Sequence, residues 1–338
     1  MLSRQLLNRV LVVLGAAVVC MLGGCASDSS VISQADNFYT DLKPAVVTDP
    51  EVSKYLQKIG DRIIAAAKKE DAKGVGPDSH KSEKTDWMYG SNMKFYLVNS
   101  KTLNAFTTGG NQMYIYNELL QQCEDEDELA AVMAHEYAHV YCRHVQQGMN
   151  RQYTILGLAL GAGAAGAVAG GKEHGAEYGT AAAGGAMALG SFVGMGFTRK
   201  DEAQADEYGF DFYTHAGWDP KRFGAFFQKM IDLGYDKTPE ELSDHPTLAS
   251  RVQVANKRAA ELPKSAKKWA KAPIADKDEF AKIKARAVQV TKAMPSDEQL
   301  QQAQTLLAAF GNCIVPTEQP EQVEARKKTV VTGKKKGS

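Results

Sequence analysis

Two histidines and a glutamate in one short segment form the pattern with the clearest chemical meaning. The HExxH pattern lies within 134–140 and comprises His135, Glu136 and His139. On a helix, residues four apart project from the same face, so the two imidazoles can bind one metal ion. Zinc accepts two such nitrogens together with a carboxylate and a water molecule in tetrahedral geometry. Glu136 would lie close enough to take a proton from that water, which would then attack a peptide carbonyl. The pattern therefore predicts one Zn²⁺ per chain and a hydrolytic reaction, with two purely structural histidines as the alternative.

A third protein ligand has to come from elsewhere in the chain. Glu202 and Asp206 are four residues apart and would share one helical face. One carboxylate can bind the metal while the other holds a ligand histidine by its free ring N–H. His245 could approach the metal or a transition-state oxyanion. On a continuous helix Cys142 would lie about 10 Å beyond His135, where core packing is the simpler role. His144 would lie on the opposite face and is a poor ligand candidate.

The elements that must position these residues follow from apolar periodicity. Residues 26–50 have the composition of a polar leader, and 70–86 that of a loop. Two short strands are expected at 93–98 and 112–116, with a glycine-containing turn between them. Amphipathic spacing predicts helices at 50–69, 124–147, 200–215, 220–233 and 246–262, with more helix in 278–310 interrupted near Pro295. We therefore expect an α+β fold, mainly helical, with a small sheet beside the helix that carries the histidines.

A glycine- and alanine-rich stretch at 153–198 separates the two groups of candidate ligands. Three interpretations are open: a pair of closely packed helices, a membrane-dipping hairpin, and a flexible cover over a cleft. Glycine and alanine contribute little transfer free energy to a membrane, which disfavours the hairpin.

Composition and the first residues bear on where the protein is located. Forty basic residues balance forty acidic ones among 338, which argues against nucleic acid as a partner. Residues 1–24 resemble a bacterial lipoprotein signal, in which Cys25 would be lipidated. The alternatives are a plain membrane anchor or a secretory signal cut elsewhere. In an oxidising compartment, Cys123, Cys142 and Cys313 form at most one internal pair. Since one long helix would separate the first two, any disulfide would involve Cys313, and three separate buried thiols are the alternative.

Several motifs in a fixed order point to one family. HExxH is followed by Arg199-x-x-Glu202-x-x-Ala205-Asp206 and then by His245-Pro246 and Arg251. This order resembles the zinc proteases of the HtpX and CAAX prenyl endopeptidase family, and especially their periplasmic lipoprotein branch. The resemblance covers about residues 35–262, including Asn104-Ala105-Phe106 ahead of a glycine pair.

The resemblance implies a role for each matching residue. His135, His139 and Glu202 would bind zinc, and Glu136 would be the general base. Asp206 would orient a ligand histidine, and Arg251 would support the site by ion pairing. In this family the position of His245 can occupy the open zinc coordination site and hold the enzyme inactive. Asn104, Ala105 and Phe106 would belong to the strand region beside the cleft, where substrate binds.

The resemblance also implies an organisation and a biological setting. A signal peptide at 1–24 would precede a metalloprotease domain at 25–262, with 153–198 as an insert. Residues 263–338 would form a helical region with a disordered basic tail, too short for the C-terminal repeats of some members. The substrates would be misfolded or misassembled envelope polypeptides, cut within the chain. The enzyme would be held by acylated Cys25 in outer-membrane lipid, on the periplasmic face in a Gram-negative cell. The alternative is a non-proteolytic, zinc-containing chaperone or assembly factor for outer-membrane proteins.

Overall fold

A computed structural model describes residues 26–74, 76–80, 84–90, 92–152, 154, 197–235 and 246–310. The expected signal peptide and Cys25, nearly all of the glycine- and alanine-rich stretch, His245, Cys313 and the basic tail lie outside the described residues.

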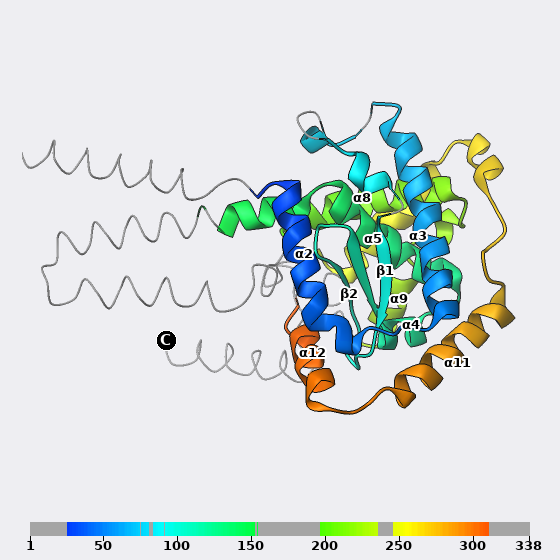
Figure 1. Cartoon of the computed structure of the whole chain (residues 1–338). Helices are drawn as coiled ribbons and strands as arrows, with labels where there is room; N and C mark the ends of the chain where they lie inside the picture. The colour runs from blue at the N-terminus through cyan, green and yellow to red at the C-terminus, as the bar shows by residue number, and fades with distance from the viewer. Residues whose placement is uncertain are drawn as a thin grey trace, which may run out of the picture.

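A small mixed sheet forms one layer of the fold (Figure 1). Its strands are β1 (Lys94–Val98), β2 (Ala105–Thr107) and β3 (Gln112–Tyr116), in the order β1-β3-β2. β1 is parallel to β3, with Lys94 opposite Gln112, and β2 is antiparallel to β3. Both expected strands are present, and β2 is a third strand, which apolar periodicity did not indicate but which lies in the strand region that the family resemblance implied for 104–106. The turn after β2 contains Gly109 at φ +71°, a conformation that favours glycine.

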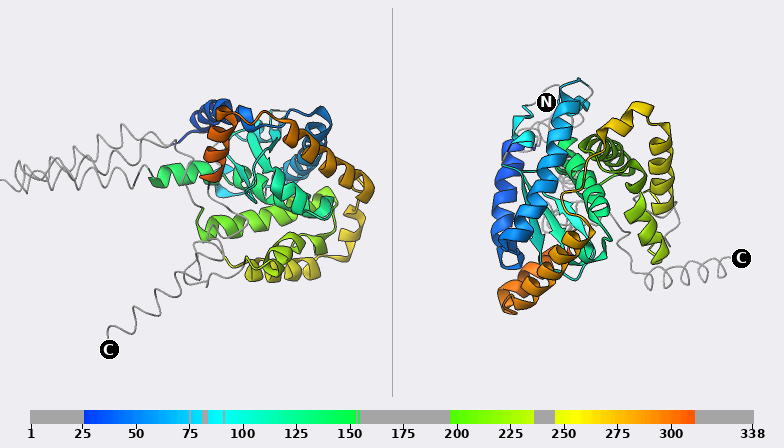
Figure 2. Two further views of the ribbon diagram at one scale, coloured as in Figure 1. Left: turned by 90° about the horizontal axis from the view of Figure 1, so that it is seen from below. Right: turned by 90° about the vertical axis from the view of Figure 1, so that its right-hand side faces the viewer.

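Two N-terminal helices cover one side of the sheet, as the side view of Figure 2 shows. Helix α3 (Pro50–Asp71) begins at the N-cap Asp49 and places Pro50 at its first position, as favoured for a proline. The expectation of a polar leader before it is wrong for α2 (Asp28–Leu42), a helix capped by Ser27. α2 contributes one buried apolar stripe, Val31, Ala35, Phe38 and Leu42, while its other face is polar. Because that other face carries many serines and aspartates, the segment as a whole has a polar composition, which does not reveal the apolar stripe.

The central helix is α5 (Glu126–Tyr141), which follows the short α4 (Asn117–Gln122). Every residue of α5 except Asp127 is buried, as expected of a helix packed on all sides. Asp125 caps its N-terminus by accepting a hydrogen bond from the Glu128 N–H. The expected helix 124–147 is broken: α5 ends at Tyr141, Arg143 adopts φ 56°, and a second helical segment runs over 144–152.

Three helices lie beyond α5 on the side away from the sheet (Figure 2). They are α8 (Arg199–Ala216), α9 (Ala225–Asp232) and α10 (Leu248–Glu261), with the 3₁₀ turn η4 (Pro220–Arg222) before α9. Thr198 and Asp201 form a capping box that fixes the start of α8. α8 makes its main contacts with α5 and α3, and α10 packs on α9.

The C-terminal part of the described chain returns to the first layer (Figure 1). After the 3₁₀ segment η6 (Lys264–Trp269), helices α11 (Lys277–Ala293) and α12 (Glu298–Ala308) flank the expected break at Pro295. α11 contacts α3 and α4, and α12 contacts α2 and the 3₁₀ turn η1 (Lys43–Ala45). The Phe310 ring stacks on Phe106 with centroids 3.9 Å apart. Two further 3₁₀ turns, η2 (Asp78–His80) and η3 (Asp86–Tyr89), complete the elements.

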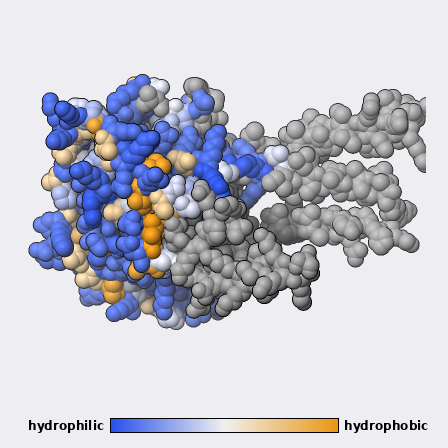
Figure 3. Space-filling view, turned by 180° about the vertical axis from the view of Figure 1, so that it is seen from behind, coloured by the Kyte–Doolittle hydropathy of each residue, from blue (hydrophilic) through white to orange (hydrophobic). Residues whose placement is uncertain are grey.

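The surface seen from behind is mostly hydrophilic, with one narrow apolar strip (Figure 3). In the described part of the chain, Leu233 and Val254 are the large apolar side chains with substantial exposure. No helix among the described residues combines the length and the hydrophobicity needed to cross a bilayer. The predicted α+β, mainly helical fold with a small sheet is confirmed.

Candidate metal centre

The candidate metal centre forms where α8 lies against α5 at unusually close range. Gly209 of α8 faces the backbone of α5: a β-carbon there would lie 3.0 Å from the His135 Cα and 3.1 Å from the His135 N. The missing side chain therefore lets the two backbones approach. This approach brings the acidic first half of α8 alongside the histidines of α5.

Three side chains converge between the two helices. The Nε2 atoms of His135 and His139 lie 3.1 Å apart. The Glu202 carboxylate contacts both: Oε2 lies 3.5 Å from His135 Nε2, and Oε1 lies 3.6 Å from His139 Nε2. One ligand atom from each residue fits within a 4.8 Å separation, and all three side chains are fully buried. Two imidazole nitrogens and one carboxylate are a donor set that suits zinc and leaves a fourth position for water. The structure thus brings together the three residues predicted to bind the metal.

Asp206 and Arg251 hold His135 in one orientation. Asp206 Oδ1 lies 2.9 Å from His135 Nδ1 and so accepts the ring N–H, which leaves Nε2 with its lone pair for a metal. Arg251 Nε and Nη2 donate to the two oxygens of Asp206 at 2.8 and 2.7 Å. Arg251 also lies 3.8 Å from Glu202 Oε2, and its guanidinium stacks over the Phe227 ring at 3.9 Å. The family resemblance implied such supporting ion pairing for Arg251.

His139 is oriented by His144, which was expected to be a poor ligand candidate, and His144 is in turn held by Gln204. Because α5 ends at Tyr141, His144 does not lie on the far face of one long helix, and its Nδ1 is 2.9 Å from His139 Nδ1. His144 Nε2 is 2.9 Å from the Gln204 side-chain oxygen, which can only accept, so His144 must donate from Nε2. His144 Nδ1 is then an acceptor for His139 Nδ1–H, and His139 Nε2 keeps its lone pair facing Glu202. The hydrogen-bond chain thus selects the tautomer that a metal ligand requires.

Glu136 lies next to this cluster as a buried carboxylate. Both of its oxygens are buried without a hydrogen-bond partner in the described structure. Burial, followed by the neighbouring Glu202 charge, raises the pKa of Glu136 to about 8. A buried, ionised carboxylate that has neither a hydrogen-bond donor nor a positive charge beside it destabilises the fold by about 1–3 kcal/mol or more. A divalent cation held by the adjacent histidines would supply that charge. The residues present therefore fit a metal ion.

The remaining predicted site residues lie on the sheet or outside the described residues. Asn104, Ala105 and Phe106 are buried at the start of β2, the edge strand that contacts α5. The Phe106 ring is already stacked between Tyr114 and Phe310, so its side chain belongs to the core. His245 lies outside the described residues, and its approach to the metal stays a prediction.

The described cysteines take no part in this cluster. Cys123 and Cys142 are both buried and unbridged. This agrees with the expectation that Cys123 and Cys142 do not form a disulfide with each other.

Comparison with known proteins decides the family. The model of peptidase family M48 matches residues 83–259, which is more than half of the chain. The chain belongs to peptidase family M48. The matched range contains α5, α8 and Arg251, and hence the entire metal cluster described above. The family resemblance inferred from the ordered motifs is confirmed, and membership of this metallopeptidase family implies a metal at the cluster.

Curated relatives from bacteria and from mitochondria show the same likeness. The "Beta-barrel assembly-enhancing protease" of Escherichia coli (strain K12) is 28% identical over 245 residues, covering 71% of this chain and 46% of that protein. The "Mitochondrial metalloendopeptidase OMA1" of Arabidopsis thaliana is 27% identical, covering 69% of this chain and 45% of that protein. "Metalloprotease LoiP" of Escherichia coli (strain K12) is 29% identical, over 48% of this chain and 60% of that protein. The chain thus spans less than half the length of the first two relatives.

Proposed function

We propose that this M48 family member is a zinc-dependent endopeptidase that cleaves misfolded or misassembled polypeptides of the cell envelope. The observation that carries the proposal is the buried cluster of His135, His139 and Glu202 beside the unpartnered carboxylate of Glu136. A purely structural zinc site is closed by four protein ligands, whereas three ligands with an adjacent carboxylate are typical of hydrolytic sites. The names of the curated relatives, all proteases or endopeptidases, support this proposal.

Each residue of the cluster has a specific part in the proposed reaction. A bound zinc ion would acidify a water molecule and polarise the scissile carbonyl. Glu136 accepts the proton of the attacking water and passes it to the leaving amine, and its burial keeps the proton affinity high enough for both steps. Asp206 and His144 hold the two ligand histidines in the tautomer that faces the metal, so no reorientation is needed when substrate arrives.

The edge strand β2 is the element best placed to hold a substrate. β2 borders the sheet, and among the described residues its outer side has no neighbouring strand. An extended polypeptide could add to this edge by main-chain hydrogen bonds, which require no particular side chains. Since Phe106 is packed in the core, we assign substrate contact at 104–106 to the backbone. Such recognition suits unfolded chains of varied sequence, because a folded protein offers few free extended segments.

The proposed setting is the periplasmic face of an outer membrane. The lipoprotein-like sequence at 1–25 supports attachment through an acylated Cys25. Relatives named as beta-barrel assembly-enhancing proteases support polypeptide substrates from the same compartment.

The test is hydrolysis of casein by the full chain and by its Glu136→Gln variant, with zinc content measured in both. Glutamine keeps the shape of the side chain and removes the base, so we expect equal zinc and a rate lower by about 10²–10⁴. Glu202→Ala should instead lose zinc while the fold is kept. If the parent binds zinc but does not hydrolyse casein, the assay is repeated with His245→Ala. If that variant also fails to hydrolyse casein, the proposal fails and the alternative of a zinc-containing chaperone is favoured.

A further inference from the structure

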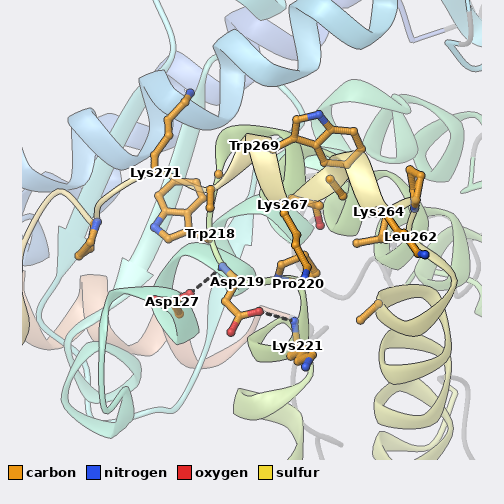
Figure 4. Close-up of a pocket in the computed structure, with 17 residues that line it drawn as sticks. Asp127, Trp218, Asp219, Pro220, Lys221, Leu262, Lys264, Lys267, Trp269 and Lys271 are labelled. Atoms are coloured by element: carbon orange, nitrogen blue, oxygen red, sulfur yellow. Dashed lines mark hydrogen bonds between the residues drawn. The ribbon is translucent and has the colours of Figure 1, made fainter.

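A cavity lies at the ends of α5 and α8 that are remote from the metal cluster. This cavity of about 680 Å³ opens between the end of α8, the start of α5 and the segment 262–273 (Figure 4). This volume lies within the range of ligand-binding pockets in proteins. Its walls are largely apolar: Trp218, Trp269 and Leu262 line it together with several alanines and prolines.

The mouth of the cavity is positively charged. It is lined by Lys221, Lys264, Lys267 and Lys271, against two aspartates. None of the four lysines has an ion-pair partner within the described part of the chain. In Figure 4 they come from different sides of the group of lining residues, with Lys264 and Lys271 on opposite sides, Lys221 below, and the Lys271 side chain directed away from the others. The cavity therefore presents several separate positive charges around an apolar interior.

The two aspartates offset only part of this charge, since four lysines and two aspartates leave an excess of two positive charges in the lining. Asp127 accepts hydrogen bonds from the Tyr213 hydroxyl at 2.8 Å and from the Asp219 N–H at 3.1 Å. Asp219 accepts from the Lys221 backbone N–H at 3.1 Å and so caps η4. Burial, followed by the charges of Arg62 and Lys69, lowers the pKa of Lys271. An acyl chain would bring only a single charge to a mouth lined by four lysines.

The cavity and the metal cluster share the same helices at a useful separation. Thr214, which lines the cavity, and Glu202 are twelve residues apart on α8, which corresponds to about 18 Å at 1.5 Å per residue. An extended polypeptide covers this distance with about six residues. One polypeptide could therefore occupy both positions at once.

We propose that this cavity binds an acidic polypeptide segment, with an aromatic or aliphatic side chain against its apolar walls and carboxylates on the surrounding lysines. The cavity is separate from the metal cluster. It would therefore hold one part of a polypeptide while another part lies at the metal cluster for cleavage. The proposal deepens the proposed function by naming a class of substrate segment, but the binding itself requires no catalysis.

The test is fluorescence anisotropy with the full chain carrying Glu136→Gln, so that the probe is not cut. The probe is a labelled peptide of about twelve residues, rich in glutamate and containing phenylalanine and leucine, long enough to span both positions. We expect it to bind at least about tenfold more tightly than matched peptides with lysine for glutamate or glycine for the apolar residues. Raising the salt concentration should reduce this preference.

Variants of the cavity separate the site from general surface charge. Lys267→Glu combined with Lys271→Glu should weaken binding about tenfold or more, whereas the matched exposed pair Lys54→Glu with Lys282→Glu should not.

Three results would overturn the assignment. These are equal binding of acidic and basic peptides, equal effects of the two lysine pairs, or displacement of the peptide by phosphatidylglycerol vesicles, which would make the site a lipid site. Peptide binding without casein hydrolysis by the parent would refute the proposed function alone. Hydrolysis without peptide binding would refute only the cavity.

Discussion

Replacement of Gly209 by alanine tests whether close helix contact builds the metal cluster. A β-carbon at Gly209 would lie 3.0–3.2 Å from three atoms of α5, all of them backbone atoms of Ala134 and His135. Backbone atoms cannot rotate aside, so α8 has to move away by several tenths of an ångström. Overpacking of this kind costs about 1–3 kcal/mol, whereas exchanging a helical glycine for alanine gains only about 1 kcal/mol. The difference leaves an expected net loss of about 1 kcal/mol.

The same movement should weaken metal binding, because Glu202 lies on the displaced helix. Its oxygens are 3.5 and 3.6 Å from the two histidine nitrogens, and a shift of the helix alters both separations. We expect zinc affinity to fall about 10–100-fold, the range typical when the support of metal ligands is disturbed. Thermal unfolding in excess chelator measures stability, and titration against a competing chelator measures affinity. The midpoint should fall by about 2–8 °C.

Gly60 provides a matched control. A β-carbon at Gly60 would lie 2.0 Å from the Phe95 ring, between α3 and β1, so Gly60→Ala should also destabilise the fold. It adds no atom to the contact between α5 and α8, and its zinc affinity should match the parent. Parent-like stability and zinc affinity in Gly209→Ala would refute the steric argument. An equal loss of affinity in both variants would show that general destabilisation, and not the helix approach, is the cause.

Three further outcomes are expected. Zinc at about a hundred times its dissociation constant should stabilise the fold by about 3 kcal/mol, and a chelator should lower the thermal midpoint by about 5–10 °C; an unchanged midpoint would contradict a metal site in the folded state. His144→Leu removes the acceptor for His139 and should reduce zinc affinity about 10–100-fold in a chelator competition, an effect absent if the contact is incidental. Burial alone would raise the pKa of Asp28, but hydrogen bonds from Arg143 and Trp87 lower it below the usual value. Ionised Asp28 thus stabilises the fold above about pH 4, and this contribution disappears as the pH falls through the lower folded-state pKa; urea unfolding from pH 6 to 3 should show a steeper loss in the parent than in Asp28→Asn.

The metal cluster could be predicted from sequence because its spacing and order carry the information. Two histidines four apart need only a helix to meet, and α5 supplies one. Glu202 was identified as the third ligand by its motif, although nothing in local periodicity places α8 against α5. The close approach depends on Gly209, whose importance is visible only once both helices are in place.

The misses share a physical cause: each depended on tertiary context. The helix α2 has a stripe of four buried residues among many polar ones, and it is stable only against the sheet and α12. The break after Tyr141 depends on Arg143 in a positive-φ conformation, held by its ion pair with Asp28 of α2. Without that break, His144 is placed on the wrong side of the helix, and its contact with His139 cannot be anticipated.

The return of the last described helix to the first has a consequence for how the protein is made. Phe310 covers Phe106 at the sheet, and the Tyr116 hydroxyl donates to the Leu307 carbonyl across 191 positions of sequence. Contacts between such distant segments form only after both have been synthesised, and they slow folding because a long loop must close first. On the ribosome, the residues that bind the metal emerge well before the helix that completes the core around β2. Assembly of the native core, and with it the proposed proteolytic activity, therefore waits until translation has passed residue 310.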